Sequence, residues 1–453
     1  MELNDENLFC IICNKNICSN QKSDVKQHFL TKKHKKNENS PKNTNFENFD
    51  LDLCELFLSN NIPLNKINNP SFKIFFRKYF NKEIPDESTL RKNYVDKVYL
   101  ETISKIKEYI GESKIWISID ETTDSCGRSV VNFIIGPLDP SFKKQKCFLL
   151  NVSEIEKVNS IQMMNFFLDS ISLIYSQSIF YTENLLLLVT DNASYMRKFG
   201  KNLKCLSKKI VHLSCLVHFL HRISENIRSN FPDIDSLVSC IKKIFKKCPS
   251  KKNKLKKKFP EMPLPPDPVI TRWGTWLKSV VYISTYFDQL KTLIFSFEEN
   301  LQVTKVKSIF EKSNVINDLV YIVTNFSFLI DIFILLQRKT PLSSSFKIFS
   351  ETLEKLSFYP FLSRKIETLK KDNIGFNFMN EIYNMDQKKF IEDSILKNYS
   401  PLELSCFNSA PITSCDVERT FSKYKNLLSD NRKKLKIENI KKYLIVYCNN
   451  FDE

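Results

Sequence analysis

Two apolar stretches that each end in an aspartate constrain this chain more than any other feature. They are Ile115–Asp120, Ile-Trp-Ile-Ser-Ile-Asp, and Leu185–Asp191, Leu-Leu-Leu-Leu-Val-Thr-Asp. Short apolar runs of this length are typical of buried strands. If the two strands are neighbours in a sheet, Asp120 and Asp191 present hard oxygen ligands to a divalent cation. A single Asp at a strand end usually forms a turn or a helix cap, whereas the pair favours a metal site.

The residues around these stretches predict the topology. Val130–Gly136 and Cys147–Ile155 are further β-rich runs, and their short connections favour antiparallel pairing. We expect a helix at Ser160–Gln177 and a strand at Leu185–Asp191 after them. A helix that begins at Ser194 and a short strand at Lys209–Leu213 should follow. This order matches a ribonuclease H-like mixed sheet, in which the first and fourth strands are adjacent. The predicted fold class is therefore α/β.

Length and charge limit the class of partner. A chain of 453 residues is expected to form two to four domains. Its 68 Lys and Arg against 51 Asp and Glu give a net charge of +17, which favours nucleic acid as partner, ahead of a membrane surface. An AT-rich genome, which enriches Lys and Asn, explains the same balance. The most apolar stretch, Leu319–Leu336, contains Asn325 and Asp331 and is expected to be a core helix rather than a membrane span.

Residues 8–36 predict a zinc finger. Cys10 and Cys13 are separated by two residues, and His28 and His34 by five, a spacing that suits tetrahedral Zn²⁺. Cys18 is an alternative ligand. The thirteen Cys of the chain and the lack of a secretory signal indicate a reducing compartment, where thiols stay free or bind metal.

The second half of this finger is expected to be one basic helix, Lys22–Lys36. Lys32 and Lys33 lie on it as candidate DNA contacts, since a zinc-stabilised basic helix is a common DNA-binding device. A purely structural zinc knob and a segment without metal are the alternatives.

Composition changes divide the rest of the chain. We expect a polar linker at 37–47 and a helical intermediate domain at 48–113. The first part of the core should span 114–232, an all-helical insertion 233–400 and the last part of the core 401–453. Within the second of these, Pro85–Ser88 predicts a helix start and Thr89–Ile110 a single helix.

Four residues with metal-binding or proton-transfer chemistry crowd into ten positions: His212, Cys215, His218 and His221. A second zinc site is one interpretation. His218 beside the aspartates, in contact with a phosphate, is another. A neutral histidine packed under the sheet is the third.

Two further stretches favour nucleic acid. Residues 242–258 hold ten Lys and no acid, and we expect a loop or a frayed helix end that neutralises phosphates or acts as a nuclear import signal. A solvated charged face is the alternative. Arg272 and Trp273 can hold a phosphate and stack on an unpaired base, although a capping cluster in a core has the same composition.

Several of these motifs occur together in one known family. The finger, Ser-Ile-Asp-Glu-Thr-Thr-Asp from Ser118, Val-Thr-Asp-Asn-Ala-Ser from Val189, the Cys-x2-His at Cys215, Thr-Arg-Trp at Thr271 and Val-Glu-Arg-Thr-Phe-Ser from Val417 appear in this order. In order and spacing the chain resembles the hAT superfamily of DNA transposases, particularly members with an N-terminal BED-like zinc finger.

The resemblance implies a ribonuclease H-like core interrupted by a helical insertion, with Asp120, Asp191 and Glu418 as the catalytic carboxylates that bind Mg²⁺ or Mn²⁺. It implies that Trp273 stacks on a flipped base and that His218 lies by the active site. It also implies double-stranded DNA at transposon terminal repeats as substrate, a dimerisation segment at 401–453, a homodimer or larger homo-oligomer, a nuclear location and no membrane association. A domesticated DNA-binding regulator of transcription or chromatin, without catalysis, is the alternative.

Overall fold

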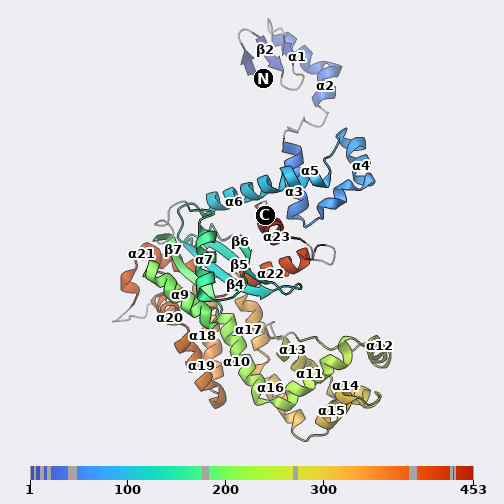
Figure 1. Ribbon diagram of the computed structural model, residues 1–453, viewed down its shortest axis with the longest axis vertical. Coiled ribbons are helices and arrows are strands. Elements are labelled where there is room, and N and C mark those ends of the chain that lie inside the picture. Colours follow the sequence, from blue (N-terminus) through green and yellow to red (C-terminus); the bar gives the residue numbers. More distant parts are fainter. Residues whose placement is uncertain are drawn as a thin grey trace. The chain divides into compact units, whose positions relative to one another are not determined.

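The structure is a computed structural model that describes residues 2–4, 7–10, 15–17, 22–38, 48–175, 183–268, 274–386, 395–428, 432 and 435–451. The chain divides into two compact units, Met1–Val98 and Tyr99–Glu453 (Figure 1). The first unit holds the segment predicted to be a zinc finger and a group of helices. The second holds a mixed sheet with many helices.

The N-terminal part of the first unit is a small antiparallel sheet followed by two short helices. Strands β1 (Glu2–Asn4), β2 (Asn7–Cys10) and β3 (Lys15–Ile17) pair in sequence order. The single helix expected at Lys22–Lys36 is instead α1 (Lys22–Leu30) and α2 (Lys32–Glu38). Thr31 causes the break, because its hydroxyl donates to the His28 carbonyl at 2.7 Å and accepts from the His34 N–H at 3.1 Å.

The rest of the first unit is helical, as the sequence predicted. Its elements are α3 (Phe49–Ser59), the 3₁₀ turn η2 (Leu64–Asn68), α4 (Pro70–Phe80), α5 (Glu87–Asn93) and the start of α6 (Val95–Ile110). Asp86 caps α5 by accepting from the Thr89 N–H at 2.7 Å, at the predicted helix start. The expected long helix is interrupted at Tyr94, which leaves helical geometry while its hydroxyl donates to Asp50 at 3.3 Å.

The second unit is built on a five-stranded mixed sheet. Its strands are β4 (Ile115–Thr123), β5 (Ser129–Pro137), β6 (Phe148–Glu154), β7 (Leu185–Thr190) and β8 (Val211–Ser214). Their order is β6-β5-β4-β7-β8; β5 is antiparallel to both neighbours, and β4, β7 and β8 are parallel. The predicted adjacency of the first and fourth strands is confirmed.

Helices cover both faces of this sheet. Phe133 of β5 packs on Phe166 and Phe167 of α7 (Ser160–Ile171), whereas the preceding residue, Asn132, hydrogen-bonds Thr420 of α22 (Cys415–Leu427). Successive strand residues point to opposite faces, so α7 and α22 lie on opposite sides. Helix α9 (Ser194–Leu206) joins α7, and α23 (Ile437–Cys448) packs beside α22 and β6.

The insertion is all-helical in its described residues. After α10 (Leu216–Asn230) come α11 (Pro232–Lys246), α12 (Pro249–Lys258), α13 (Thr275–Thr285), α14 (Phe287–Phe295), α15 (Leu301–Phe310), α16 (Val315–Phe326), α17 (Leu329–Leu336), α18 (Leu342–Ser357), α19 (Pro360–Asp372) and α20 (Phe376–Asp386). The chain returns through η3 (Ile395–Asn398), α21 (Pro401–Cys406) and η4 (Phe407–Ser409). Asn373 fixes the end of α19 to β8, exchanging two hydrogen bonds with the Ser214 backbone.

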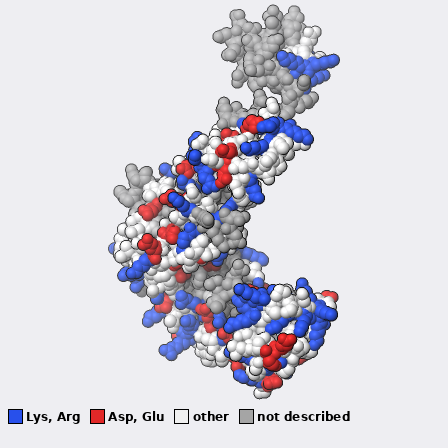
Figure 2. Space-filling view, turned by 45° about the vertical axis from the view of Figure 1, so that its right-hand side comes forward, with Lys and Arg blue, Asp and Glu red and all other residues white. Residues whose placement is uncertain are grey.

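The Lys-rich stretch 242–258 is helical, not the loop or frayed end expected. It covers the end of α11 and all of α12. Lysine is a good helix former, Pro249 suits the first turn, and the buried Leu255 anchors α12. Figure 2 shows Lys and Arg side chains in the lower part of the view, where the insertion lies.

Among the described residues one helical stretch, Val315–Leu336, is long and apolar enough to cross a membrane by length and composition alone. Core helices pass the same test. Helix α16 packs against α11 and α13, and α17 against α18, which favours the core-helix interpretation.

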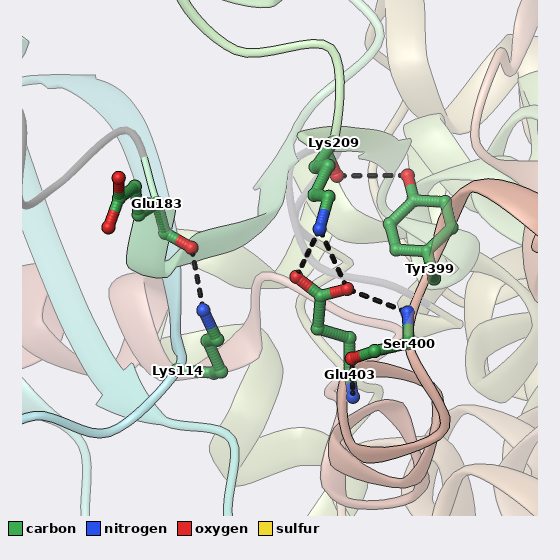
Figure 3. Close-up of polar contacts among 6 residues, drawn as sticks. All are labelled: Lys114, Glu183, Lys209, Tyr399, Ser400 and Glu403. Carbon is green, nitrogen blue, oxygen red and sulfur yellow. Dashed lines mark hydrogen bonds and ion pairs between the residues drawn. The ribbon is translucent and has the colours of Figure 1, made fainter.

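An ion pair between a buried carboxylate and a half-exposed lysine joins the returning chain to the sheet (Figure 3). Lys209, which precedes β8, donates to both carboxylate oxygens of Glu403 at 2.7 and 2.9 Å. The Ser400 N–H donates to the same carboxylate at 2.8 Å, completing a capping box at α21. Burial by itself raises the pKa of Glu403, but the hydrogen bonds from Lys209 and Ser400 outweigh it and hold the pKa below its usual value.

We expect Glu403→Gln to lower the free energy of unfolding by about 2 kcal/mol at neutral pH, because it removes charge-assisted hydrogen bonds from a buried site. A carboxyl with a lowered folded-state pKa stabilises the fold above its unfolded pKa, and this contribution disappears as the pH falls. The difference in the free energy of unfolding between wild type and variant, measured with urea, should therefore become smaller at acidic pH. Glu367→Gln, at an exposed position on α19, is the matched control. An equal loss in both variants would contradict the role of the ion pair.

Candidate functional site

The finger brings three of its four predicted ligands together. Cys10 at the end of β2 and His34 on α2 are buried, and the Cys10 Sγ lies 3.5 Å from the His34 Nδ1. The His34 Nδ1 lies 3.1 Å from the His28 Nε2. The three ligand atoms all fall within 4.8 Å of one another, so this group can bind a metal ion such as zinc. Cys13 lies outside the described residues, and Lys32 and Lys33 are exposed on α2.

At the sheet, Asp120 and Asp191 lie on neighbouring parallel strands. Ser118 of β4 is paired with Val189 of β7, and continuing this register by two residues places Asp120 beside Asp191. Asp120 is also the cross-strand partner of Asn132, which faces α22, so Asp120 points to the same face. Asp191 directly follows β7, and its carboxylate accepts from the Ala193 N–H at 3.1 Å.

Glu418 reaches this sheet end because the segment before α22 binds the start of α10. The Leu216 N–H donates to the Ile412 carbonyl at 3.0 Å, and the Ser414 N–H to the Cys215 Sγ at 3.2 Å. These bonds set the first turn of α22 beside the first turn of α10. Glu418 Oε1 consequently lies 3.7 Å from His218 Nε2.

The pKa values of Asp120 and Glu418 are shifted by burial and by the charged groups around them. Burial raises the pKa of Asp120 to about 7; His218 opposes this rise, and Asp191 adds to it. Burial likewise raises the pKa of Glu418 to about 9, again opposed by His218, with Cys215 and Asp120 adding to the rise. Asp120 therefore interacts with both of the other carboxylates, and His218 with Asp120 and Glu418. Such mutual perturbation in a partly buried cluster is common at functional sites.

The carboxylates are less tightly gathered than the finger ligands. Across the described parts of the chain, Cys10, His28 and His34 form the group of three or more whose ligand atoms all lie within 4.8 Å. The charges of Asp120, Asp191 and Glu418 influence one another, but their carboxylate oxygens do not all lie within 4.8 Å.

Two buried hydrogen bonds hold α22 against the sheet. Asn132 Nδ2 donates to Thr420 Oγ1 at 2.7 Å, two residues from Glu418. The Tyr424 hydroxyl donates to Asp124 at 3.0 Å. Asp124 also accepts from Arg128 and from backbone N–H groups of the β4–β5 turn; burial opposes these bonds, yet the pKa of Asp124 is lowered. Asp124 is thus a structural carboxylate.

The His and Cys cluster divides into separate roles. His212 is a buried residue of β8. Its Nε2 lies 2.8 Å from Thr190 Oγ1, and its pKa is lowered to about 4 by burial and by Lys204. It is therefore the neutral packed histidine of the third interpretation. Cys215 is buried at the start of α10, and His218 faces Glu418.

His221, one turn further along α10, lines a cavity, and its Nε2 lies 3.7 Å from Glu225 Oε1. The cavity has a volume of about 260 Å³ between α10, α11 and α13, and Trp276 and Arg228 also line it. Arg272 and Trp273, predicted DNA contacts, lie outside the described residues.

Sequence reasoning missed the residues that position the site. Asn132 is the one polar residue in the apolar run Val130–Gly136, and that interruption was an available signal. Tyr195, just after Asp191, was also missed. Its hydroxyl lies 3.5 Å from Glu121, and burial together with Asp191 raises its pKa.

Residues 85–248 match a domain of unknown function, DUF659, a family found in hAT-type and other transposase-like proteins. The matched region contains Asp120, Asp191 and His218 but ends before Glu418. No curated protein matches the chain.

We expect the full chain to retain one equivalent of zinc after dialysis, bound at the finger, and Cys10→Ala or His34→Ala to lose it, because each removes a buried ligand. Metal content measured by elemental analysis tests this. Cys126→Ser, which alters an exposed thiol in the β4–β5 turn, should leave the zinc content unchanged. Full zinc content in Cys10→Ala would exclude this site.

Thr420→Val should lower the free energy of unfolding by about 1–3 kcal/mol, because it leaves the buried Asn132 amide without its acceptor. Thr420→Ser keeps the hydroxyl and should retain most of the stability. Urea unfolding of both variants measures the difference. Equal stability of the Val variant and the wild type would show that the hydrogen bond does not hold α22.

Proposed function

We propose that this protein is a DNA transposase of the hAT type, which cleaves and joins DNA phosphodiesters at transposon ends. The observation that carries the proposal is the position of Glu418. It lies far along the chain from the two aspartates, yet it stands 3.7 Å from His218 and interacts with Asp120 at the end of the sheet. The DUF659 match over residues 85–248 supports a transposase-related origin.

A ribonuclease H-like core is part of this proposal. The strand order β6-β5-β4-β7-β8, with β5 antiparallel to its neighbours, agrees with that fold. The helical insertion between α10 and α21, and the return of the chain to the sheet as α22, agree with the interrupted core of the family.

Divalent cations fit the three carboxylates. Glu418 Oε1 is buried without a hydrogen-bond donor, and the pKa values of Asp120 and Glu418 are raised by burial, with a smaller contribution from neighbouring acidic groups. A cation relieves both conditions. In the proposal Asp120, Asp191 and Glu418 hold two Mg²⁺ or Mn²⁺ ions, whose role is to activate water or a 3′-hydroxyl and to stabilise the leaving oxygen.

The side chains of the site have separate tasks. His218 orients Glu418 and offers a ring N–H to a phosphate oxygen entering the site. The backbone N–H groups of Glu121 and Ala193 hold the Asp120 and Asp191 carboxylates, leaving other lone pairs free to bind ions. Asn132 and Thr420 keep Glu418 on the correct face of the sheet.

Binding of the DNA is assigned to the finger and to the basic helices. Lys32 and Lys33 on α2 are exposed, and α12 carries a largely exposed row of Lys. Contacts of this kind release counterions, so binding should weaken steeply with salt. A homo-oligomer and a nuclear location complete the proposal.

Asp120→Asn should abolish Mn²⁺-dependent nicking of a duplex that carries a candidate terminal repeat, while leaving affinity for that duplex unchanged. The amide keeps the size of the side chain and removes the charge needed to hold a cation. Gel assays of nicking and of binding measure the two properties. Asp288→Asn, at an exposed position on α14, is the control and should nick normally.

Nicking by the Asp120 variant at the wild-type rate would refute the catalytic assignment. Tight duplex binding by the wild type with no nicking in Mg²⁺ or Mn²⁺ would instead favour the domesticated DNA-binding regulator.

A further inference from the structure

Helix α4 exposes its apolar side chains instead of packing them. None of its residues is buried. Ile74, Phe75, Tyr79 and Phe80 are exposed by 61%, 49%, 63% and 50%. A helix in a globular unit normally buries its apolar stripe, and contiguous exposed apolar surface usually marks a binding site.

The exposed rings form one connected group. Phe75 lies 5.0 Å from Tyr79, 5.7 Å from Phe76 and 6.1 Å from Phe80, measured between ring centroids. Each ring is held by its neighbours in a tilted or edge-on arrangement, so the group is already ordered. A flat aromatic partner can therefore stack on it with little loss of side-chain entropy.

The segment that carries these rings is basic. Residues 60–82 contain five basic residues and no Asp or Glu: Lys66, Lys73, Arg77, Lys78 and Lys82. Arg77 pairs with Glu83, just beyond this segment. The Lys78 Nζ lies 5.0 Å from the centre of the Tyr79 ring. Figure 2 shows Lys, Arg and uncharged side chains, together with some Asp and Glu, on the unit that carries α4.

We propose that α4 is a binding platform for single-stranded nucleic acid, with bases stacked on Phe75, Tyr79 and Phe80 and phosphates near Lys73, Lys78 and Lys82. Exposed rings interleaved with lysines are the combination that unpaired strands require. In a duplex the base faces are covered by neighbouring pairs and cannot reach these rings. A second copy of α4 would bring like charges together, which disfavours a symmetric contact between copies.

This inference does not depend on the carboxylate site. A protein that opens DNA ends needs a surface for the unpaired strand, but α4 would bind such a strand whether or not the chain cleaves DNA. Asp120→Asn should accordingly keep full affinity for single strands, so the two proposals fail separately.

The test is fluorescence anisotropy with the full-length protein, a labelled oligo-dT strand of about 20 nucleotides, and a labelled duplex of equal length. The triple variant Phe75→Leu/Tyr79→Leu/Phe80→Leu keeps apolar volume and helix propensity but removes the rings. We expect its Kd for the single strand to rise at least tenfold, with the Kd for the duplex unchanged within about twofold. Ile74→Ala, on the same helix and equally exposed, should change neither value.

Circular dichroism of the triple variant should match the wild type, which excludes unfolding as the cause. Unchanged single-strand affinity, or equal losses for both DNA forms, would overturn the proposal. Unchanged single-strand affinity together with a smaller oligomer in light scattering would show that this face joins protein copies instead.

Discussion

The attachment of α22 to one face of the mixed sheet is the constraint on which the candidate site depends. Asn132 and Thr420 form one buried hydrogen bond, and Asp124 and Tyr424, 300 residues apart in the chain, form another. A buried polar group without a partner costs about 1–3 kcal/mol, so only one placement of α22 satisfies both pairs. This placement carries Glu418 to the strand ends where Asp120 and Asp191 lie.

Two aspartates four residues apart, Asp120 in β4 and Asp124 directly after it, show how local surroundings set their roles. Asp124 accepts hydrogen bonds from Arg128, Tyr424 and backbone N–H groups, and its pKa is lowered. Asp120 accepts one bond from the Glu121 N–H and faces other carboxylates, and its pKa is raised to about 7 by burial. The first arrangement stabilises the fold. The second concentrates negative charge at some cost in stability, as sites that bind cations commonly do.

The basic surplus of the chain is distributed over separate surfaces with different chemistry. Lys32 and Lys33 lie on a finger whose ligands can bind zinc, and the lysines of α12 form a polar face. Helix α4 combines Lys73 and Lys78 with exposed rings. In the two proposals all three surfaces attract phosphate, and the exposed rings of α4 add aromatic stacking, so the three surfaces would suit different forms of nucleic acid.

Local pattern in the sequence determined the elements of the core and singled out the candidate carboxylates. Continuous apolar runs specified β4, β5 and β7, and the chain order of strands and helices specified that β4 and β7 are adjacent. The Cys and His spacing similarly specified the finger group, of which Cys10, His28 and His34 are in place. Backbone breaks were less predictable. Thr31 divides the finger helix through side-chain hydrogen bonds that propensities do not include, and the helix before the sheet is interrupted at Tyr94.

Only the tertiary structure decided which polar residues meet. Nothing in the sequence near Asn132 indicates that its partner is Thr420, or that Cys215 accepts a hydrogen bond from Ser414. The exposure of the α4 rings could not be predicted either, because the sequence of an apolar helix does not show whether its apolar face is buried or exposed. Secondary structure follows from local periodicity, whereas contacts between distant residues depend on how complete elements pack, and that information is spread over the whole chain.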